Sequence, residues 1–250
     1  LSSEAGWGKT SLLANISRQA QDAHPGLIVA SGICSTYQGA GDPYLPFREI
    51  LRMLCGDVEG KWAAGAISRQ DAMRLWALLP TSARALVSLG RNLIDTFVPY
   101  PSLLSHAQAH AGVAPELLQQ LRAVSQSQHN SRLSQERILE EYLEVLLEIS
   151  RQAPLLLILD DLHWADSASI NLLYHLGRRL RDSAVMILGA YRPEDVHLTR
   201  DGKAHPLAPV LHEFKGLYGN IWLHLDQGGI PEGRQFVDAL LDHMPNQLDD

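Results

Sequence analysis

The residues best suited to chemistry stand at the start of the chain, in the stretch SEAGWGKTS. It follows the pattern G-x-x-x-x-G-K-[ST], with Ser3 in the place of the first glycine. Glycines let successive backbone N–H groups point at one phosphate, and a helix that follows presents its positive N-terminus to it. The spacing therefore predicts a phosphate-binding loop rather than a plain glycine-rich turn before a helix. The predicted loop comprises Ala5, Gly6, Trp7, Gly8, Lys9, Thr10 and Ser11.

Within that loop, Lys9 is expected to reach the β- and γ-phosphates of a nucleotide, and the Thr10 hydroxyl to bind Mg²⁺. A second group of suitable side chains, Asp160 and Asp161, ends the apolar run LLLILDD. Asp160, at the strand tip, would hold the metal, and Asp161 would orient or deprotonate an attacking water. Acidic residues after a strand are also common helix caps. Because the loop and the carboxylates occur in one chain, nucleotide binding is the favoured interpretation.

The elements that must position these side chains are apolar strands alternating with amphipathic helices. Strands are expected over residues 27–34, 155–160, 184–191 and, nearer a sheet edge, 220–225. Continuous apolarity is typical of parallel strands that are buried on both faces. Amphipathic helices are expected over residues 10–23, 134–152 and 168–181. The alternation predicts an α/β fold.

Residues 44–132 interrupt the alternation of strands and helices, and their sequence pattern predicts a mostly helical insertion. Proline and glycine separate its expected helices, and a polar loop follows them at residues 126–131. The expected helical windows are 47–54, 72–79, 82–98 and 115–124.

The composition limits the classes of function. The 250 residues carry 28 acidic and 21 basic side chains, a net charge of −7, and this acidic balance disfavours a nucleic-acid-binding module. Two cysteines are too few for a disulfide framework, so a reducing, cytoplasmic location is expected. No apolar run has the length of a membrane helix, and no signal peptide opens the chain. His106 and His110 are spaced to share a helix face but lack a third ligand nearby in sequence, so no zinc site is expected.

The blocks SEAGWGKTSLL, DDLHWAD and GAYRPE resemble the ATPase module of bacterial STAND-type signal-transduction ATPases, which are AAA-related P-loop proteins. The resemblance covers most of the chain but is diffuse through residues 44–132. It implies a P-loop NTPase three-layer sandwich with a mainly parallel sheet and a long helical insertion. It also implies ATP and Mg²⁺ as cofactors, and output and sensor domains outside this chain as partners. Self-association is left open, and neither nucleic acid nor membrane is expected to contact this module.

Carried over residue by residue, the resemblance matches Asp160 to the Mg²⁺ acid and Asp161 to the catalytic or water-positioning acid. Arg192 matches the polar sensor of the γ-phosphate. The carboxyl end of a parallel strand faces the ligand crevice, which agrees with this role, although an exposed pair of Arg192 with a nearby acid is the alternative. His163 and Trp164 could be switch residues near the γ-phosphate, but packing is the favoured interpretation.

Two functions follow as hypotheses. The first is a switch that binds Mg²⁺-ATP, hydrolyses it slowly and reports to domains outside the chain. The second is a nucleotide-dependent interaction scaffold without significant hydrolysis. The guanine-reading sequence N-K-x-D is absent, so adenine is favoured.

The positions of the motifs also suggest a fragment of a longer protein. Only Leu1 and Ser2 precede the loop motif, so most of the first strand of the expected sheet is missing from this sequence. Residues 1–250 are accordingly interpreted as a P-loop ATPase domain fragment, and residues 232–250 as the start of a lid region.

Overall fold

Three parallel strands form the centre of the computed structural model, which describes residues 1–4, 8–35, 43–127, 134–197, 205–219 and 221–225. Strands β1 (Ile28–Ile33), β2 (Leu155–Asp160) and β3 (Val185–Gly189) lie in the order β1-β2-β3. In the register, Ile33 pairs with Asp160, so the carboxyl end of β2 lies beside that of β1. The predicted α/β fold with a mainly parallel sheet is confirmed.

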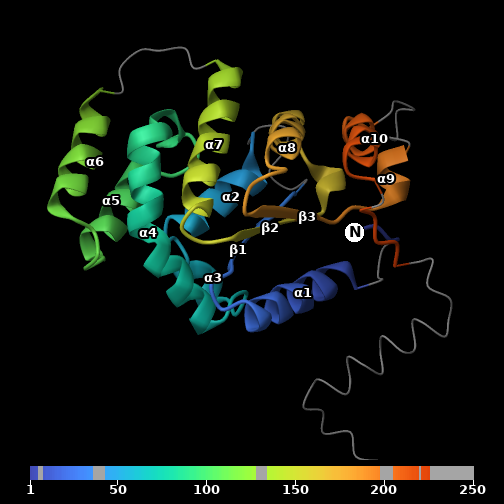
Figure 1. The fold of residues 1–250 in the computed structure, drawn as a ribbon, viewed down its shortest axis with the longest axis horizontal. Coiled ribbons are helices and arrows are strands. Elements are labelled where there is room, and N and C mark those ends of the chain that lie inside the picture. The colour runs from blue at the N-terminus through green and yellow to red at the C-terminus, as the bar shows by residue number, and fades with distance from the viewer. Residues whose placement is uncertain (5–7, 36–42, 128–133, 198–204, 220, 226–250) are drawn as a thin grey trace, which may run out of the picture.

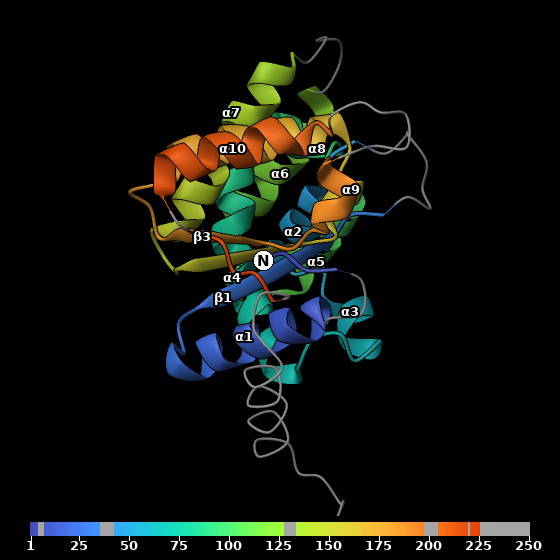
Figure 2. The same ribbon diagram turned by 90° about the vertical axis from the view of Figure 1, so that its right-hand side faces the viewer.

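Helices cover both faces of this sheet, as Figures 1 and 2 show. On one face, Leu156 and Ile158 of β2 pack in a cluster with Leu13 of α1 (Lys9–Ala23). On the other, alternate residues of β2 belong to the main core, which includes α7 (Gln135–Ser150) and α8 (Ser167–Arg179). Every residue of β2 is buried, because successive side chains point to opposite covered faces.

The predicted edge strand at 220–225 is much shorter than expected. Among the residues described there, only His224 is paired, through an isolated parallel bridge to Ser2. Ser2 also bridges Tyr191 in parallel, and its N–H donates to Leu223 O at 2.9 Å. Ser2 therefore lies between the end of β3 and residues 223–225, directly before the predicted phosphate loop.

Helices occupy the described part of the segment between β1 and α7, as predicted. Their bounds are α2 (Leu45–Leu54), α3 (Glu59–Ala63), α4 (Arg69–Leu89), α5 (Tyr100–Ala109) and α6 (Pro115–Ser127). A short 3₁₀ turn, η2 (Arg91–Leu93), follows α4. The predicted polar loop at 126–131 is wrong at its start, since α6 runs to Ser127; residues 128–133 lie outside the described residues.

The prediction of two separate helices at 72–79 and 82–98 is also wrong. Helix α4 continues through Pro80 and ends at Leu89, before Gly90. An interior proline costs a helix about 3 kcal/mol. Leu79 and Ala83, on either side of Pro80, are completely buried, and this burial offsets that cost. Rules based on neighbouring residues cannot predict such packing.

Helices α7 and α8 start within one residue of the predicted positions. Ser134 caps α7 by accepting a hydrogen bond from Arg137 N, and Asp166 caps α8 by accepting one from Ser169 N at 2.9 Å. Such caps satisfy backbone donors that a helix start leaves unpaired. Beyond β3 lie α9 (Pro193–His197) and α10 (Leu207–Tyr218). Within the described ranges, no helix is long and apolar enough to span a membrane.

Candidate active site

The end of the predicted phosphate loop lies at the start of α1. Gly8 caps this helix with φ of 72°, a left-handed conformation that glycine adopts without strain, and Lys9 and Thr10 form its first turn. Ser11, also predicted to belong to the loop, is exposed in the same turn. The other predicted loop residues, at 5–7 (Ala5, Gly6 and Trp7), lie outside the described residues.

The Lys9 side chain turns back onto the residues that precede the loop. Its Nζ donates to Ser3 O at 2.7 Å, to Glu4 O at 2.7 Å and to Ser3 Oγ at 3.1 Å. Ser3, which replaces the first glycine of the pattern, is fully buried. The ammonium group is thus held at the mouth of the loop by neutral oxygens, which a phosphate could replace.

A hydrogen bond joins the loop to the tip of β2. Thr10 Oγ1 donates to Asp160 Oδ2 at 2.8 Å, across a sequence separation of 150 residues. Asp160 is buried, and its other oxygen accepts from Asp161 N at 2.9 Å. A hydroxyl and a carboxylate are oxygen ligands of the kind that Mg²⁺ prefers. The structure therefore brings together the two residues predicted to bind the metal.

Asp161 and Arg192 lie on neighbouring turns, after β2 and after β3. Asp161 has φ of 55° and starts the short 3₁₀ turn η3 (Leu162–Trp164). Leu162 N donates to Ala190 O at 2.8 Å, so η3 is fixed to the chain that leads from β3 to Arg192. The backbone thus places both predicted catalytic residues at the same edge of the sheet.

The charges of Lys9 and Arg192 act on each other. Burial lowers the pKa of Lys9, and the positive charge of Arg192 lowers it further, while Asp161 and Asp160 oppose that change. Arg192 Nε is buried and has no hydrogen-bond partner among the residues that the structure describes. Two cations whose charges act on each other, one with an unpaired buried N–H among the described residues, suit a polyphosphate. The residues present therefore fit a Mg²⁺-nucleotide.

Comparison with known families agrees with this geometry. The family of the AAA ATPase domain matches residues 1–188. The chain belongs to this family. Nucleotide binding and hydrolysis are therefore its general chemistry, with ATP and Mg²⁺ as the expected ligands of this AAA ATPase domain. No curated protein and no solved structure matches the chain.

Two side chains beside the site differ in their burial. His163, in the middle of η3, has a fully buried side chain, whereas Trp164 is 42% exposed. The favoured interpretation of packing therefore agrees with the position of His163 but not with that of Trp164.

Cys34 follows β1 and is buried. Burial is the main cause that raises the pKa of its thiol to about 12, and the negative charges of Asp166 and Asp161 raise it further.

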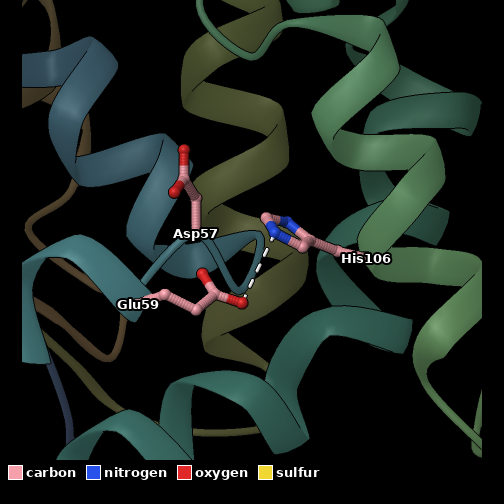
Figure 3. A group of neighbouring side chains, drawn as sticks. All are labelled: Asp57, Glu59 and His106. Carbon is pink, nitrogen blue, oxygen red and sulfur yellow. Dashed lines mark ion pairs between the residues drawn. The ribbon is translucent and has the colours of Figure 1, made fainter. Parts of the chain in front are cut away.

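Away from this AAA site, the fold assembles a group that could hold a metal ion. Asp57, Glu59 and His106 have ligand atoms that all lie within 4.8 Å of one another, and Figure 3 shows how they approach. The sequence did not suggest this group, because α5 brings His106 to the turn before α3 through tertiary packing. Glu59 Oε1 lies 3.6 Å from His106 Nε2, an ion pair when the imidazole is protonated. His110, which the spacing placed on the same helix face as His106, does not belong to this group; its Nδ1 accepts a hydrogen bond from Gly112 N.

Proposed function

We propose that this AAA ATPase domain is the nucleotide-dependent switch of a multidomain signalling or transcription-regulatory protein, of the STAND type. The observation that carries the proposal is the bond from Thr10 Oγ1 to Asp160 Oδ2, because it joins the loop to the strand tip where a metal would sit. The slow hydrolysis of bound ATP would release the switch, and sensor and output domains outside this chain would read the change.

Each site residue has a distinct role in this proposal. Lys9 exchanges its bonds with the Ser3 and Glu4 oxygens for the β- and γ-phosphate oxygens. The backbone N–H groups of Gly8 to Ser11 would donate to the phosphates at the positive end of α1. Thr10 and Asp160 would hold Mg²⁺, which neutralises phosphate charge when it is bound.

Asp161 and Arg192 would act on the γ-phosphate. Asp161 orients the attacking water and takes up its proton while the bond between the γ-phosphorus and the bridging oxygen breaks. Arg192 contacts the γ-phosphate and so distinguishes ATP from ADP. The unpaired Nε of Arg192 among the described residues supports this role, because a phosphate oxygen would supply the missing partner.

The test is a time course of phosphate release with saturating Mg²⁺-ATP, combined with calorimetric binding of ATP. Lys9→Ala is expected to lose ATP binding, and Asp161→Ala to bind ATP but lose turnover by at least about 100-fold. Asp182→Ala removes an exposed carboxylate in the turn before β3 and serves as the matched control, with unchanged turnover.

The second candidate function is a nucleotide-dependent scaffold without significant hydrolysis. It would be favoured if the wild type binds ATP but turns over no faster than Asp161→Ala. A wild type that fails to bind ATP under conditions in which it is folded would contradict both functions. Light scattering with ATP, with ADP and without nucleotide would show whether nucleotide also drives self-association.

A further inference from the structure

His163 is a polar residue whose side chain is completely buried beside the site. Its side chain has 0% exposure, and neither Nδ1 nor Nε2 has a hydrogen-bond partner among the residues that the structure describes. An unpaired buried polar group costs folding free energy, whereas an apolar side chain of similar size does not. If packing were the only role of this position, leucine would serve it better.

The surroundings of the imidazole suggest a different role. His163 Nε2 lies 3.6 Å from Asp195 Oδ2 and 3.9 Å from Asp161 Oδ1. Neither contact is a hydrogen bond at these distances, yet a shift of less than an ångström would complete either one. A single N–H can donate well to only one of the two carboxylates. The imidazole Nε2 therefore has two alternative partners.

These two partners belong to the two turns that carry the catalytic residues. Asp161 starts η3, and Asp195 lies in α9, the short helix that directly follows Arg192. His163 thus lies close both to the proposed water-orienting acid and to the segment that carries the proposed γ-phosphate sensor. The bond from Leu162 N to Ala190 O at 2.8 Å holds η3, which contains His163, against the chain that leads to Arg192.

We propose that His163 is a positioning residue that couples Arg192 to Asp161, an inference that rests on the proposed function. When the γ-phosphate draws the Arg192 segment toward it, Asp195 moves with that segment and ceases to compete for the imidazole. The Nε2–H then donates to Asp161 and fixes the carboxylate in the orientation that the attacking water requires. Without the γ-phosphate, Asp195, the nearer of the two carboxylates, competes for the donor and Asp161 remains unoriented.

The first test separates this role from packing. His163→Leu is expected to lower kcat by about 10-fold or more, the scale of a misplaced catalytic group, while KM for ATP changes by less than about 2-fold. Its urea midpoint is expected to stay the same or rise, because the unpaired nitrogens are removed. His163→Gln keeps an N–H donor and is expected to recover part of the lost kcat.

The second test uses the competing carboxylate. Asp195→Ala is expected to raise kcat by about 2- to 10-fold, the range of one net hydrogen bond, because the imidazole then has only Asp161 as a partner. In the His163→Leu background, the same substitution is expected to leave kcat unchanged. Such non-additivity would show that Asp195 acts through His163.

The outcomes distinguish this inference from the proposed function. If Asp161→Ala abolishes turnover but His163→Leu has wild-type kcat, the role of His163 is overturned and the ATPase function stands. The role of His163 is also overturned, with the ATPase function unaffected, if His163→Leu loses stability and turnover together. It is overturned likewise if the effects of the Asp195 and His163 substitutions on kcat are additive. If the wild type hydrolyses ATP no faster than Asp161→Ala, both the hydrolysing switch and the positioning role of His163 fail.

Discussion

Gly32 in β1 is a position where one methyl group should destabilise the whole sheet. A Cβ at Gly32 would lie 2.0 Å from Pro46 O, 2.6 Å from Pro46 C and 2.7 Å from Pro46 Cα. All three atoms belong to the backbone at the start of α2, so no side-chain rotation relieves the clash. The substitution Gly32→Ala therefore requires α2 to move away from β1.

The size of that movement follows from the distances. Ordinary contact begins at 3.4 Å, so the Pro46 carbonyl must retreat by about 1.4 Å. Phe47, Ile50 and Leu51 of α2 are almost completely buried, and the retreat opens gaps around them. Overpacking typically costs about 1–3 kcal/mol, and a backbone clash belongs at the upper end, so we expect a loss of about 3 kcal/mol.

Urea unfolding measures this loss directly. Gly32→Ala is expected to lower the midpoint by about 1 M with little change in m. ATP affinity should fall as well, because Ile33, the next residue, pairs with Asp160. Gly26→Ala is the matched control: it lies in the turn before β1, and a Cβ there meets nothing within 4 Å. A loss below about 0.5 kcal/mol, the scale of neutral surface substitutions, would refute the close approach of β1 and α2.

Three further predictions concern single atoms. Tyr142→Phe should lower the free energy of unfolding by about 1 kcal/mol, because the buried hydroxyl donates to Phe47 O at 2.9 Å; an unchanged thermal midpoint would contradict this. Thr10→Val should weaken Mg²⁺-dependent ATP binding by at least about 10-fold while Thr10→Ser retains it, and equal affinities in calorimetry would exclude a metal role for the hydroxyl. Burial raises the pKa of Cys34 to about 12 from an ordinary 9.0, so its thiol stays neutral at pH 8. The rate of its alkylation in the folded protein, measured by mass spectrometry, should therefore keep rising beyond pH 10. A rate that reaches a plateau near pH 9 would contradict the raised pKa.

The sequence by itself determined the local features of this AAA ATPase domain. The run LLLILD is β2 with the predicted bounds, because continuous apolarity suits a strand covered on both faces. The loop pattern predicted a helix from residue 10, and α1 starts one residue earlier, at Lys9. These features depend on neighbouring residues alone, so periodicity and spacing could find them.

The motifs predicted that Thr10 and Asp160 share a metal ion, but only the tertiary structure decided the contacts that distant side chains make. The hydrogen bond from Thr10 to Asp160 depends on how α1 packs against the end of β2. The position of His163 near Asp161 and Asp195 depends on how the segments after β2 and β3 meet. The run of α4 through Pro80 has the same origin, since core packing there outweighs a local helix-breaking preference. Burial of apolar surface has no direction and acts between residues far apart in the chain, so a local pattern cannot predict which partners it brings together.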